Sequence, residues 1–477
     1  MWYNSSKLIV GGNVVLMDEK KSIPIEKNNK YIVNIIDNGS EGEGIAKIND
    51  FTIFVPGAIK DEKCEILILK VNKNFAYGKL LNIISESKYR QKADCCTYKR
   101  CGGCELRHIK YEYTLKMKQE KVQNLLNKSL KQPIDVDETI GMKEPFNYRN
   151  KLQYPIGKNK EGKPIIGVFV KKSHEIIETS NCLIQNKDSE EIANYIIKLI
   201  KDNNIPVYDE KTLTGQIRHL VIKIGVKTKE IMCIIVSNEK EITNENILVE
   251  KLTNRFPNIK TIIKNINNKN TNVILGNENV VLYGQGYITD KLDEYTFKIS
   301  PMSFYQTNPV QTEILYNTAI GLAELKKDDI LMDLYCGIGT IGIFASKYVK
   351  KVYGIEIIKE AVNDAIENAK INNINNIDFM VGDVEKVFDD FINKKRDNPT
   401  VIFVDPPRKG LDTNTINNIL NLETPRVVYI SCNPATMARD LKLLEEKYNI
   451  VKIQPVDMFP YTSHVECVTV LYAKETL

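Results

Sequence analysis

The alternation of apolar and polar positions in residues 26–86 is typical of short strands separated by turns. We expect five strands there, at 31–36, 42–48, 51–55, 64–71 and 75–83. Five short strands in about sixty residues predict a small closed β-barrel, whose groove suits single-stranded nucleic acid. Residues 1–25 read as an N-terminal extension with one candidate strand.

A central region follows at residues 87–297. The apolar spacing from Leu106 to Leu130 is helical, with no proline to interrupt it, and we expect this helix to pack on the C-terminal domain. Beyond Tyr148 the pattern is mixed α+β. The strands predicted in this part are at 165–170, 216–224, 230–236 and 272–275.

Residues 298–477 alternate strand-like and helix-like segments, which is the pattern of a doubly wound, Rossmann-like α/β domain. The predicted strands are at 331–334, 352–355, 377–381, 401–404 and 427–430. Open α/β sheets carry their functional residues at the carboxyl ends of such strands. We therefore look for chemistry immediately after each one.

Length and apolar content limit the class of protein. The 477 residues suggest about three domains. No apolar stretch approaches the roughly 20 residues that a membrane helix requires. The apolar run at 8–17 is short, is interrupted by Gly-Gly-Asn and lacks a cleavage site, so it is a poor signal peptide. We expect a cytoplasmic, monomeric protein without an obligate protein partner.

Charge is unevenly distributed. Residues 88–172 hold 20 lysines and arginines against 9 acidic residues, a net charge of +11 in a chain whose total is +5. A basic block of this size favours a polyanion partner, most plausibly nucleic acid. The alternative is a lysine-rich, solvated surface.

A glycine-rich loop, Gly337-x-Gly339-x-x-Gly342, follows the strand at 331–334. Taken alone, this spacing is a weak dinucleotide signal. Acidic residues near the ends of three successive strands, Asp333, Glu356 and Asp383, suit the ribose hydroxyls and the adenine amino group of a nucleoside. This row favours S-adenosylmethionine over NAD as the cofactor.

Four ordered motifs carry a resemblance to a known family. They are Ser-Cys432-Asn-Pro, Asp405-Pro-Pro-Arg-Lys-Gly, Ser-Phe-Tyr-Gln306-Thr-Asn and Phe-Pro-x-Thr-x-His-x-Glu466. Together they closely resemble the RNA uracil-5-methyltransferases, above all the bacterial 23S rRNA (uracil-5-)-methyltransferases that carry an iron–sulfur cluster. The resemblance covers nearly the whole chain. It implies a methyltransferase domain at 298–477 and an OB-like TRAM barrel at 26–86.

The reaction explains the residue types. Carbon 5 of uracil is a weak nucleophile until a thiolate adds at carbon 6, and Cys432 suits this role because even a free thiol is partly ionised at pH 7. Glu466 is the predicted base for the carbon-5 proton, with His464 as runner-up. By the same resemblance, the residues expected to line the methyl-donor pocket are Gln306, Tyr335, Gly337, Glu356, Asp383 and Asp405.

Cys95-x5-Cys101-x2-Cys104 has a metal-ligand spacing that needs a fourth ligand, and Cys182 is the best-placed candidate. The resembled family draws its fourth cluster cysteine from a corresponding segment. An all-cysteine set favours [4Fe-4S], with zinc as the alternative. Cys96 makes the first ligand ambiguous, but the spacing favours Cys95.

Two segments of the central region, 146–151 and 216–219, mix aromatic residues with cations, as RNA-contacting surfaces do. The alternative for either segment is an ordinary strand with an exposed face. Addition to carbon 6 also requires that the uridine be flipped out of its stack. We expect 23S rRNA as the partner, with the tRNA T-loop as the second choice. The remaining alternative, a non-catalytic TRAM-domain RNA-binding protein, is disfavoured by the presence of both Cys432 and Glu466.

Overall fold

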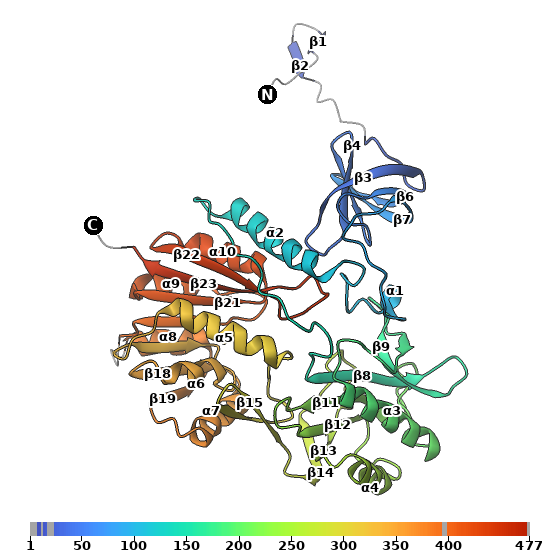
Figure 1. Ribbon diagram of the computed structural model, residues 1–477, viewed down its shortest axis with the longest axis vertical. Helices are drawn as coiled ribbons and strands as arrows, with labels where there is room; N and C mark the ends of the chain where they lie inside the picture. The colour runs from blue at the N-terminus through green and yellow to red at the C-terminus, as the bar shows by residue number, and fades with distance from the viewer. Residues whose placement is uncertain (1–6, 11–12, 17–22, 394–397, 475–477) are drawn as a thin grey trace. The chain divides into compact units, whose positions relative to one another are not determined.

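The computed structural model describes residues 7–10, 13–16, 23–393 and 398–474 (Figure 1). The chain divides into two compact units. Unit 1 contains the residues up to Lys92 together with His108–Lys110, and unit 2 contains Ala93–Arg107 and everything from Tyr111 onward. Within the described ranges, no helix is both long enough and apolar enough to cross a membrane.

The five strands predicted for residues 26–86 are present in unit 1. They are β3 (Lys30–Asn38), β4 (Gly44–Ile48), β5 (Phe51–Val55), β6 (Lys63–Val71) and β7 (Phe75–Ser85). They form a closed barrel in the order β3-β4-β5-β7-β6. Alternate residues such as Val33, Ile35, Ile66 and Ile68 fill its core, which follows from the two-residue period of a strand.

The N-terminal extension differs from its prediction. Two short strands, β1 (Lys7–Val10) and β2 (Asn13–Leu16), pair antiparallel where one strand was expected.

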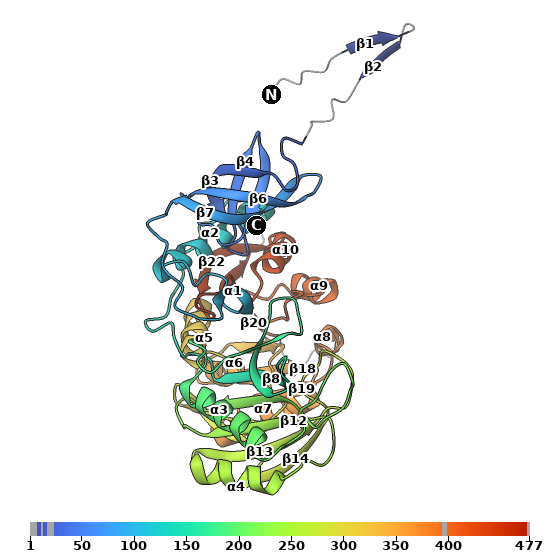
Figure 2. The same ribbon diagram turned by 90° about the vertical axis from the view of Figure 1, so that its right-hand side faces the viewer.

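The first large sheet of unit 2 has seven strands in the order β10-β9-β8-β11-β12-β13-β14. Their bounds are β8 (Lys151–Lys158), β9 (Pro164–Phe169), β10 (Ile176–Glu178), β11 (Ile217–Ile224), β12 (Ile231–Ser237), β13 (Ile259–Ile266) and β14 (Glu278–Gly284). Helices α3 (Lys187–Asp202) and α4 (Glu245–Arg255) pack on one face of this central sheet, as the green elements of Figure 2 show.

The strand predicted at 272–275 is wrong. The Asn267 side chain donates to the carbonyl oxygens of Val273 and Ile274, at 2.7 and 2.9 Å. Because a side chain satisfies these backbone groups, the segment forms a loop, and the edge strand begins only at Glu278.

The second large sheet has the order β19-β18-β17-β20-β21-β23-β22. Its strands are β17 (Ile330–Leu334), β18 (Lys351–Glu356), β19 (Ile377–Val381), β20 (Val401–Val404), β21 (Arg426–Ser431), β22 (Tyr448–Val456) and β23 (Glu466–Ala473). The first five strands are parallel, as the sequence predicts. β23 runs antiparallel to both β21 and β22, so the sheet is mixed.

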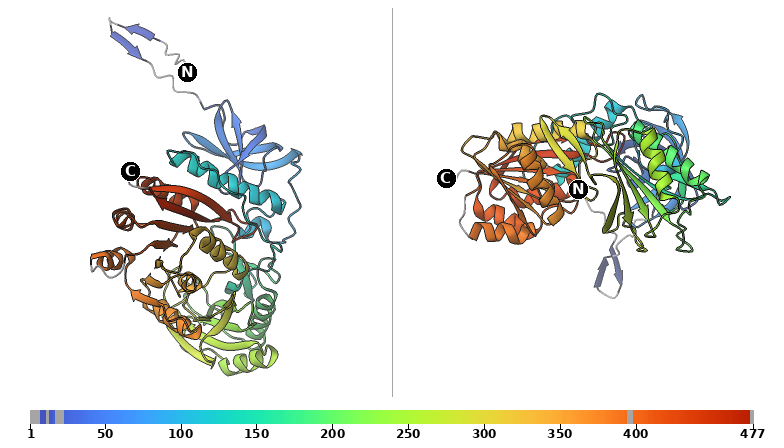
Figure 3. Two further views of the ribbon diagram at one scale, coloured as in Figure 1. Left: turned by 60° about the vertical axis from the view of Figure 1, so that its left-hand side comes forward. Right: turned by 90° about the horizontal axis from the view of Figure 1, so that it is seen from below.

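Helices cover both faces of this sheet (Figure 3). α5 (Pro309–Ala323), α6 (Thr340–Ser346) and α7 (Lys359–Ile371) share a core with Leu331 and Val428. α8 (Val384–Asn393), α9 (Thr413–Leu422) and α10 (Pro434–Leu444) share a core with Met332 and Val427. Adjacent residues of one strand therefore face opposite layers, which explains the continuous apolar runs of the sequence. The hairpin of β15 (Ile288–Leu292) and β16 (Tyr295–Ile299) precedes α5.

The helix predicted at 106–130 is α2 (Tyr111–Ser129), and a four-residue helix, α1 (Tyr98–Cys101), precedes it. α2 starts five residues later than expected because Ile109 forms a β-bridge with Arg90. α2 packs against α10 and β22, and its residues Val122 and Leu126 belong to the same core as those elements.

Candidate active site

The antiparallel register of β21 and β23 places Cys432 opposite Glu466. Ser431, the last residue of β21, pairs with Cys467 of β23. Cys432 follows Ser431 along the chain, and Glu466 precedes Cys467. Because the strands are antiparallel, these two residues come next to the pair on the same side. Glu466 is 4% exposed and Cys432 is half-buried. The two residues predicted to be nucleophile and base thus lie next to each other.

Asp405 and Arg408 add two further charged groups beside this pair. Asp405 follows β20, the parallel neighbour of β21. Burial, and after it the Asp405 carboxylate, raises the pKa of Glu466 to about 8, while Arg408 has a smaller, opposing effect. Burial also raises the pKa of Asp405 to about 7. A carboxyl group with a pKa near the working pH is suited to take up and release a proton.

The Cys432 thiol is less acidic than a free cysteine. Burial, and after it the carboxylates of Glu466 and Asp405, raise its pKa to about 11. This corrects the expectation that a useful fraction of the thiol is already ionised at neutral pH. In the absence of substrates the nucleophile is therefore protonated, and it needs an acceptor for its proton.

The residues after Cys432 fix its place at the strand end. Asn433 caps α10 by accepting from the Ala435 backbone N–H at 3.2 Å, and Pro434 occupies the first turn of the helix. The Asn433 side chain also donates to the carbonyl oxygen of Arg408, at 2.9 Å. The loop after β20 and the turn after β21 are thereby tied together beside the thiol.

The glycine-rich loop between β17 and α6 is bound to two acidic side chains. Gly337 N–H donates to Glu356 Oε2 at 3.1 Å, and Gly342 N–H donates to Asp333 Oδ2 at 3.0 Å. Gly337 and Gly339 have φ angles of 56° and 81°, in the left-handed region that glycine tolerates best. Asp333 is only 1% exposed, and burial raises its pKa to about 8. It therefore supports the loop from within the sheet, while Glu356 lies nearer to solvent.

The other residues predicted for the methyl-donor pocket gather at the same edge of the sheet. Tyr335, Glu356, Asp383 and Asp405 end or follow the successive strands β17, β18, β19 and β20. Tyr335 itself has a left-handed φ of 68°. Gly337 lies in the loop just described.

Gln306 comes from a different segment, between β16 and α5. Asn150 donates to the Gln306 carbonyl oxygen at 2.9 Å, and the Lys223 ammonium donates to the carbonyl oxygens of Ser300 and Ser303, both at 2.9 Å. The central sheet therefore holds the segment that carries Gln306.

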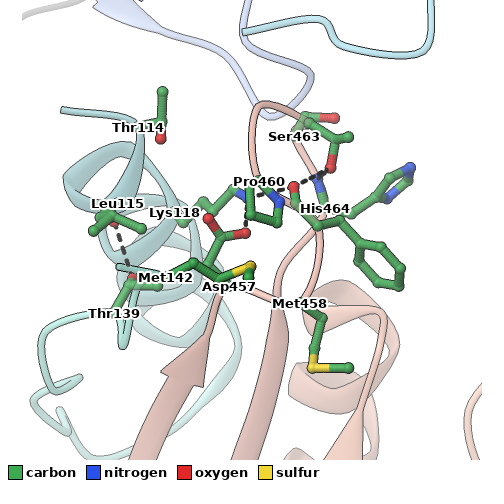
Figure 4. Close-up of polar contacts among 12 residues, drawn as sticks. Thr114, Leu115, Lys118, Thr139, Met142, Asp457, Met458, Pro460, Ser463 and His464 are labelled. Carbon is green, nitrogen blue, oxygen red and sulfur yellow. Dashed lines mark hydrogen bonds and ion pairs between the residues drawn. The ribbon is translucent and has the colours of Figure 1, made fainter. Parts of the chain in front are cut away.

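The loop at 457–465, called here the β22–β23 loop, leads directly into Glu466. Figure 4 shows Lys118, a buried lysine of α2, beside Asp457 and Pro460 of this loop. Lys118 Nζ donates to Asp457 Oδ1 at 2.5 Å and to the Phe459 carbonyl oxygen at 3.1 Å. The Tyr111 hydroxyl donates to the other oxygen of Asp457, at 2.8 Å. Burial lowers the pKa of Lys118.

Three more side chains hold the same loop through its carbonyl oxygens. Asn308 donates to Met458 at 2.9 Å, Tyr148 donates to Pro460 at 3.2 Å, and Lys121 donates to Ser463 at 3.0 Å. Tyr148 is 5% exposed, so within the segment 146–151 this aromatic side chain is packed in the interior and does not offer a surface for stacking on RNA. His464 is exposed, whereas Glu466 is buried beside the thiol. Glu466 is therefore the better-placed base of the two.

The cysteine segment 93–107 contacts the β22–β23 loop. Leu106 N–H donates to the Tyr461 carbonyl oxygen at 3.0 Å. The Arg107 guanidinium lies 4.2 Å from the ring centre of Tyr461 and 4.8 Å from that of Phe146. Arg107 is also paired with Asp94 at 2.7 Å. The segment that carries the metal-ligand spacing is thus fixed to the loop that leads to the base.

The cysteines predicted to bind a metal lie within electrostatic reach of one another. Burial, and after it the neighbouring thiols of Cys182, Cys101 and Cys95, raise the pKa of Cys104 to about 12. Cys96, in contrast, is exposed. Among the described residues, however, no group of three or more His, Cys, Asp or Glu side chains has the arrangement of a metal site. The four thiols share a neighbourhood without forming a closed ligand set.

Two contributors to the site were missed in the sequence. Arg408 was seen only as part of a motif, although it acts on both Glu466 and Cys432. Lys118 was missed altogether, although it lies four residues before Val122 and eight before Leu126, on the apolar stripe of the predicted helix. A cation on such a stripe is the signal that could have revealed a buried ion pair.

Comparison with known proteins identifies the family. Residues 110–474 match the tRNA (Uracil-5-)-methyltransferase family, and residues 26–81 match the TRAM domain. The chain is 44% identical to an uncharacterized RNA methyltransferase of Clostridium tetani, over 95% of this chain and 98% of that one. It is 45% identical to one of Staphylococcus aureus, over 94% and 99% of the two chains.

A solved structure agrees with these matches. The structure of Pyrococcus abyssi tRNA (uracil-54, C5)-methyltransferase with S-adenosyl-L-homocysteine is 27% identical, with a TM-score of 0.75, over 93% of this chain and all of that chain. The predicted α/β methyltransferase domain and TRAM barrel are confirmed. The chain belongs to the tRNA (uracil-5-)-methyltransferase family and is an S-adenosylmethionine-dependent RNA (uracil-5-)-methyltransferase.

Proposed function

We propose that Cys432 and Glu466 carry out the methylation by addition and elimination. The Cys432 sulfur forms a bond to carbon 6 of a flipped-out uracil, and the electron pair of the 5,6 double bond moves into an enolate. Carbon 5 of this enolate then takes the methyl group from the sulfonium of S-adenosylmethionine. S-adenosylhomocysteine is the leaving group of that step.

The elimination restores the ring. Glu466 takes the proton from carbon 5, the 5,6 double bond re-forms, and the bond between sulfur and carbon 6 breaks to release Cys432. The adjacency of Cys432 and Glu466 across β21 and β23 is the observation that carries this proposal. Asp405 is the other carboxylate that acts on the Cys432 pKa, so we assign to it the thiol proton of the first step.

The methyl donor is assigned to the strand ends beside Cys432. Its proposed ligands are Gln306, Tyr335, Gly337, Glu356, Asp383 and Asp405. Glu356 is already oriented, because its two oxygens accept from the backbone N–H groups of Gly337 and Ile358, at 3.1 and 2.9 Å. Each oxygen retains a lone pair for a ribose hydroxyl.

We further propose that Cys95, Cys101, Cys104 and Cys182 hold a [4Fe-4S] cluster, with zinc as the alternative. The mutual effects of these thiols on their pKa values support the set, and so does its all-cysteine composition. When bound, the metal would crosslink the segment 93–107 to the segment around Cys182. No step of the methyl transfer requires it.

The proposed substrate is 23S rRNA, methylated in the cytoplasm by a monomer. A TRAM barrel together with a cysteine cluster supports this choice. The likeness to a tRNA (uracil-54, C5)-methyltransferase favours tRNA as the second candidate.

A deletion strain separates the two substrates. Mass spectrometry of its 23S rRNA and its tRNA, each compared with the parent strain, should show 5-methyluridine missing at a position in 23S rRNA. The modification should return with the wild-type gene and not with Cys432→Ala. If 5-methyluridine is lost only from tRNA, tRNA is the substrate instead of rRNA. If the 5-methyluridine content of both RNAs is unchanged, the proposed activity is rejected.

A further inference from the structure

A pocket of about 860 Å³ lies at one edge of the central sheet. It is formed by β8, β9, β10, the start of β11 and the segment 208–211, and its lining contains none of the residues assigned above to the reaction. Ile156, Ile165 and Ile176 supply apolar walls, and Phe169 is a half-buried aromatic side chain among them. Walls of this kind suit an organic ring rather than a small ion.

A β-bulge places two adjacent polar side chains in this lining. Ile217 pairs with Ser237 and His219 pairs with Val236, so Arg218 is the additional residue of β11. A bulge redirects a side chain that would otherwise point to the opposite face of the strand. Arg218 and His219 therefore both line the pocket, although they are only 5% and 8% exposed.

Each of these two side chains has a buried polar atom without a partner. Arg218 Nη1 donates to the carbonyl oxygens of Asn267 and Lys269, at 2.6 and 2.9 Å, and the guanidinium lies 4.5 Å from the ring centre of Tyr208. Within the described part of the chain, Arg218 Nε and His219 Nδ1 have no hydrogen-bond partner.

Burial lowers the pKa of His219 to about 4, so its ring is neutral at pH 7. The Arg218 Nε–H can therefore donate to an acceptor on a ligand. The neutral His219 ring nitrogen beside it can donate or accept a second hydrogen bond. The edges of nucleobases have this pattern.

The exposed part of the lining carries unpaired positive charge. Lys158, Lys160 and Lys211 are exposed and form no ion pair among the residues that the structure describes. The lining also contains four carboxylates: those of Glu175, Glu178 and Glu210 have partners at 2.7, 3.9 and 2.9 Å, and that of Asp209 accepts from the Lys211 backbone N–H at 2.8 Å. The available charge at the opening therefore favours an anion such as a phosphate.

We propose that this pocket binds one unpaired nucleotide of the RNA substrate, distinct from the uridine that is methylated. The base packs against Phe169, its edge contacts Arg218 Nε and His219 Nδ1, and the lysines at the opening hold the neighbouring phosphates. The proposal rests on the RNA methyltransferase function proposed above. It gives the central sheet a role in choosing which uridine reaches Cys432.

The test uses the full-length protein and total RNA from a strain that lacks its gene. Methyl transfer is measured for wild type, Phe169→Ala and the double variant Lys160→Ala with Lys211→Ala. Tyr283→Ala is the matched control, because Tyr283 is an aromatic residue, 44% exposed, on β14 at the other edge of the same sheet. Ultraviolet crosslinking of wild type to the same RNA, followed by peptide mapping, reports contact directly.

Phe169→Ala should raise KM for RNA about five- to 150-fold, the range for loss of one base–aromatic stack, with KM for S-adenosylmethionine and the melting temperature unchanged. The lysine variant should reduce the slope of log affinity against log salt by about 1.4, as loss of two single-strand phosphate contacts predicts. Tyr283→Ala should behave as wild type, and the crosslink should map to the peptide that contains Phe169.

If both pocket variants have the wild-type KM for RNA and no crosslink maps to Phe169, the proposal that the pocket binds a nucleotide is overturned. The proposed methylation activity is unaffected by that result. If the wild-type protein forms no 5-methyluridine, the proposed activity fails. The crosslink and the salt dependence of binding then decide the pocket on their own.

Discussion

Lys118 of α2 and Asp457 of the β22–β23 loop form a buried ion pair at 2.5 Å, nine residues before the proposed base. The lysine side chain is 2% exposed, and the aspartate side chain is fully buried. Removal of one partner of such a pair leaves an uncompensated charge in the interior, which costs far more than the intact pair contributes. The pair therefore acts mainly as a constraint on where the loop can lie.

Lys118→Met should lower the free energy of unfolding by about 3–5 kcal/mol, because it leaves the Asp457 carboxylate buried and unpaired. The double variant Lys118→Met with Asp457→Asn should recover most of this loss while kcat stays below that of wild type. Urea unfolding and methylation kinetics measure the two effects. Lys116→Met, on the exposed side of the same helix, is the control, and an equal loss there would contradict the assignment.

Cys432→Ala should lose methylation by more than about a thousandfold while it retains binding of RNA and of S-adenosylmethionine, since only a thiolate at this position adds to carbon 6. RNA that contains 5-fluorouridine should trap the wild-type enzyme covalently, because fluorine at carbon 5 cannot leave as a proton. Gel electrophoresis under denaturing conditions shows the trapped species. Comparable turnover by the alanine variant would refute the mechanism.

Glu466→Gln should permit addition and methyl transfer but block removal of the carbon-5 proton. Glutamine keeps the shape of the side chain but cannot accept a proton at neutral pH. The methylated adduct should therefore accumulate on ordinary RNA, as a protein–RNA complex that survives denaturation. Normal turnover without this complex would transfer the role of base to His464 or to a water molecule.

The same residue should make stability depend on pH. Burial raises the Glu466 pKa from an ordinary value of 4.5 to about 8. Its contribution to stability is complete below about pH 4.5 and is lost as pH rises through 8, because the unfolded chain ionises first. The loss has an upper bound of roughly 5 kcal/mol. The melting temperature of Glu466→Gln should therefore exceed that of wild type at pH 8.5 and equal it at pH 4.5. A difference in melting temperature that stays constant across this pH range would contradict the burial of a titrating carboxyl.

Protein purified without oxygen should be brown and contain about four iron atoms per chain. Serine at Cys95, Cys101, Cys104 or Cys182 should each abolish the cluster, whereas Cys96→Ser should retain it. Iron analysis and the visible absorption spectrum measure both results. Stoichiometric zinc without iron would replace [4Fe-4S] by the zinc alternative.

The first five strands of the methyltransferase domain are visible in the sequence because each is a short, mainly apolar run. The bounds expected for β19 and β20, Ile377–Val381 and Val401–Val404, are those of the structure. Their order along the chain also sets which residues stand at the carboxyl edge. The motifs on that edge follow from local pattern and need no knowledge of distant contacts.

Contacts between distant segments could not be predicted in this way. The pairing of Cys432 with Glu466 depends on β23 running antiparallel to β21, and an apolar run has no direction. The sequence also does not show that Tyr148 is buried against Pro460, because an aromatic residue among cations has the same composition on a surface. The raised pKa of the Cys432 thiol likewise comes from burial, and after it from two carboxylates, which only the folded chain brings about.

The supports of the β22–β23 loop have a consequence for biosynthesis. Asn308, Lys118 and Lys121 precede their partners in the loop by 150, 339 and 342 residues. The ribosome therefore makes every one of these supports before it makes the loop, at a rate of about 5–20 residues per second. Glu466 is therefore synthesised after the residues that hold its loop. Cys432 and Glu466 can come together only when both β21 and β23 have been translated.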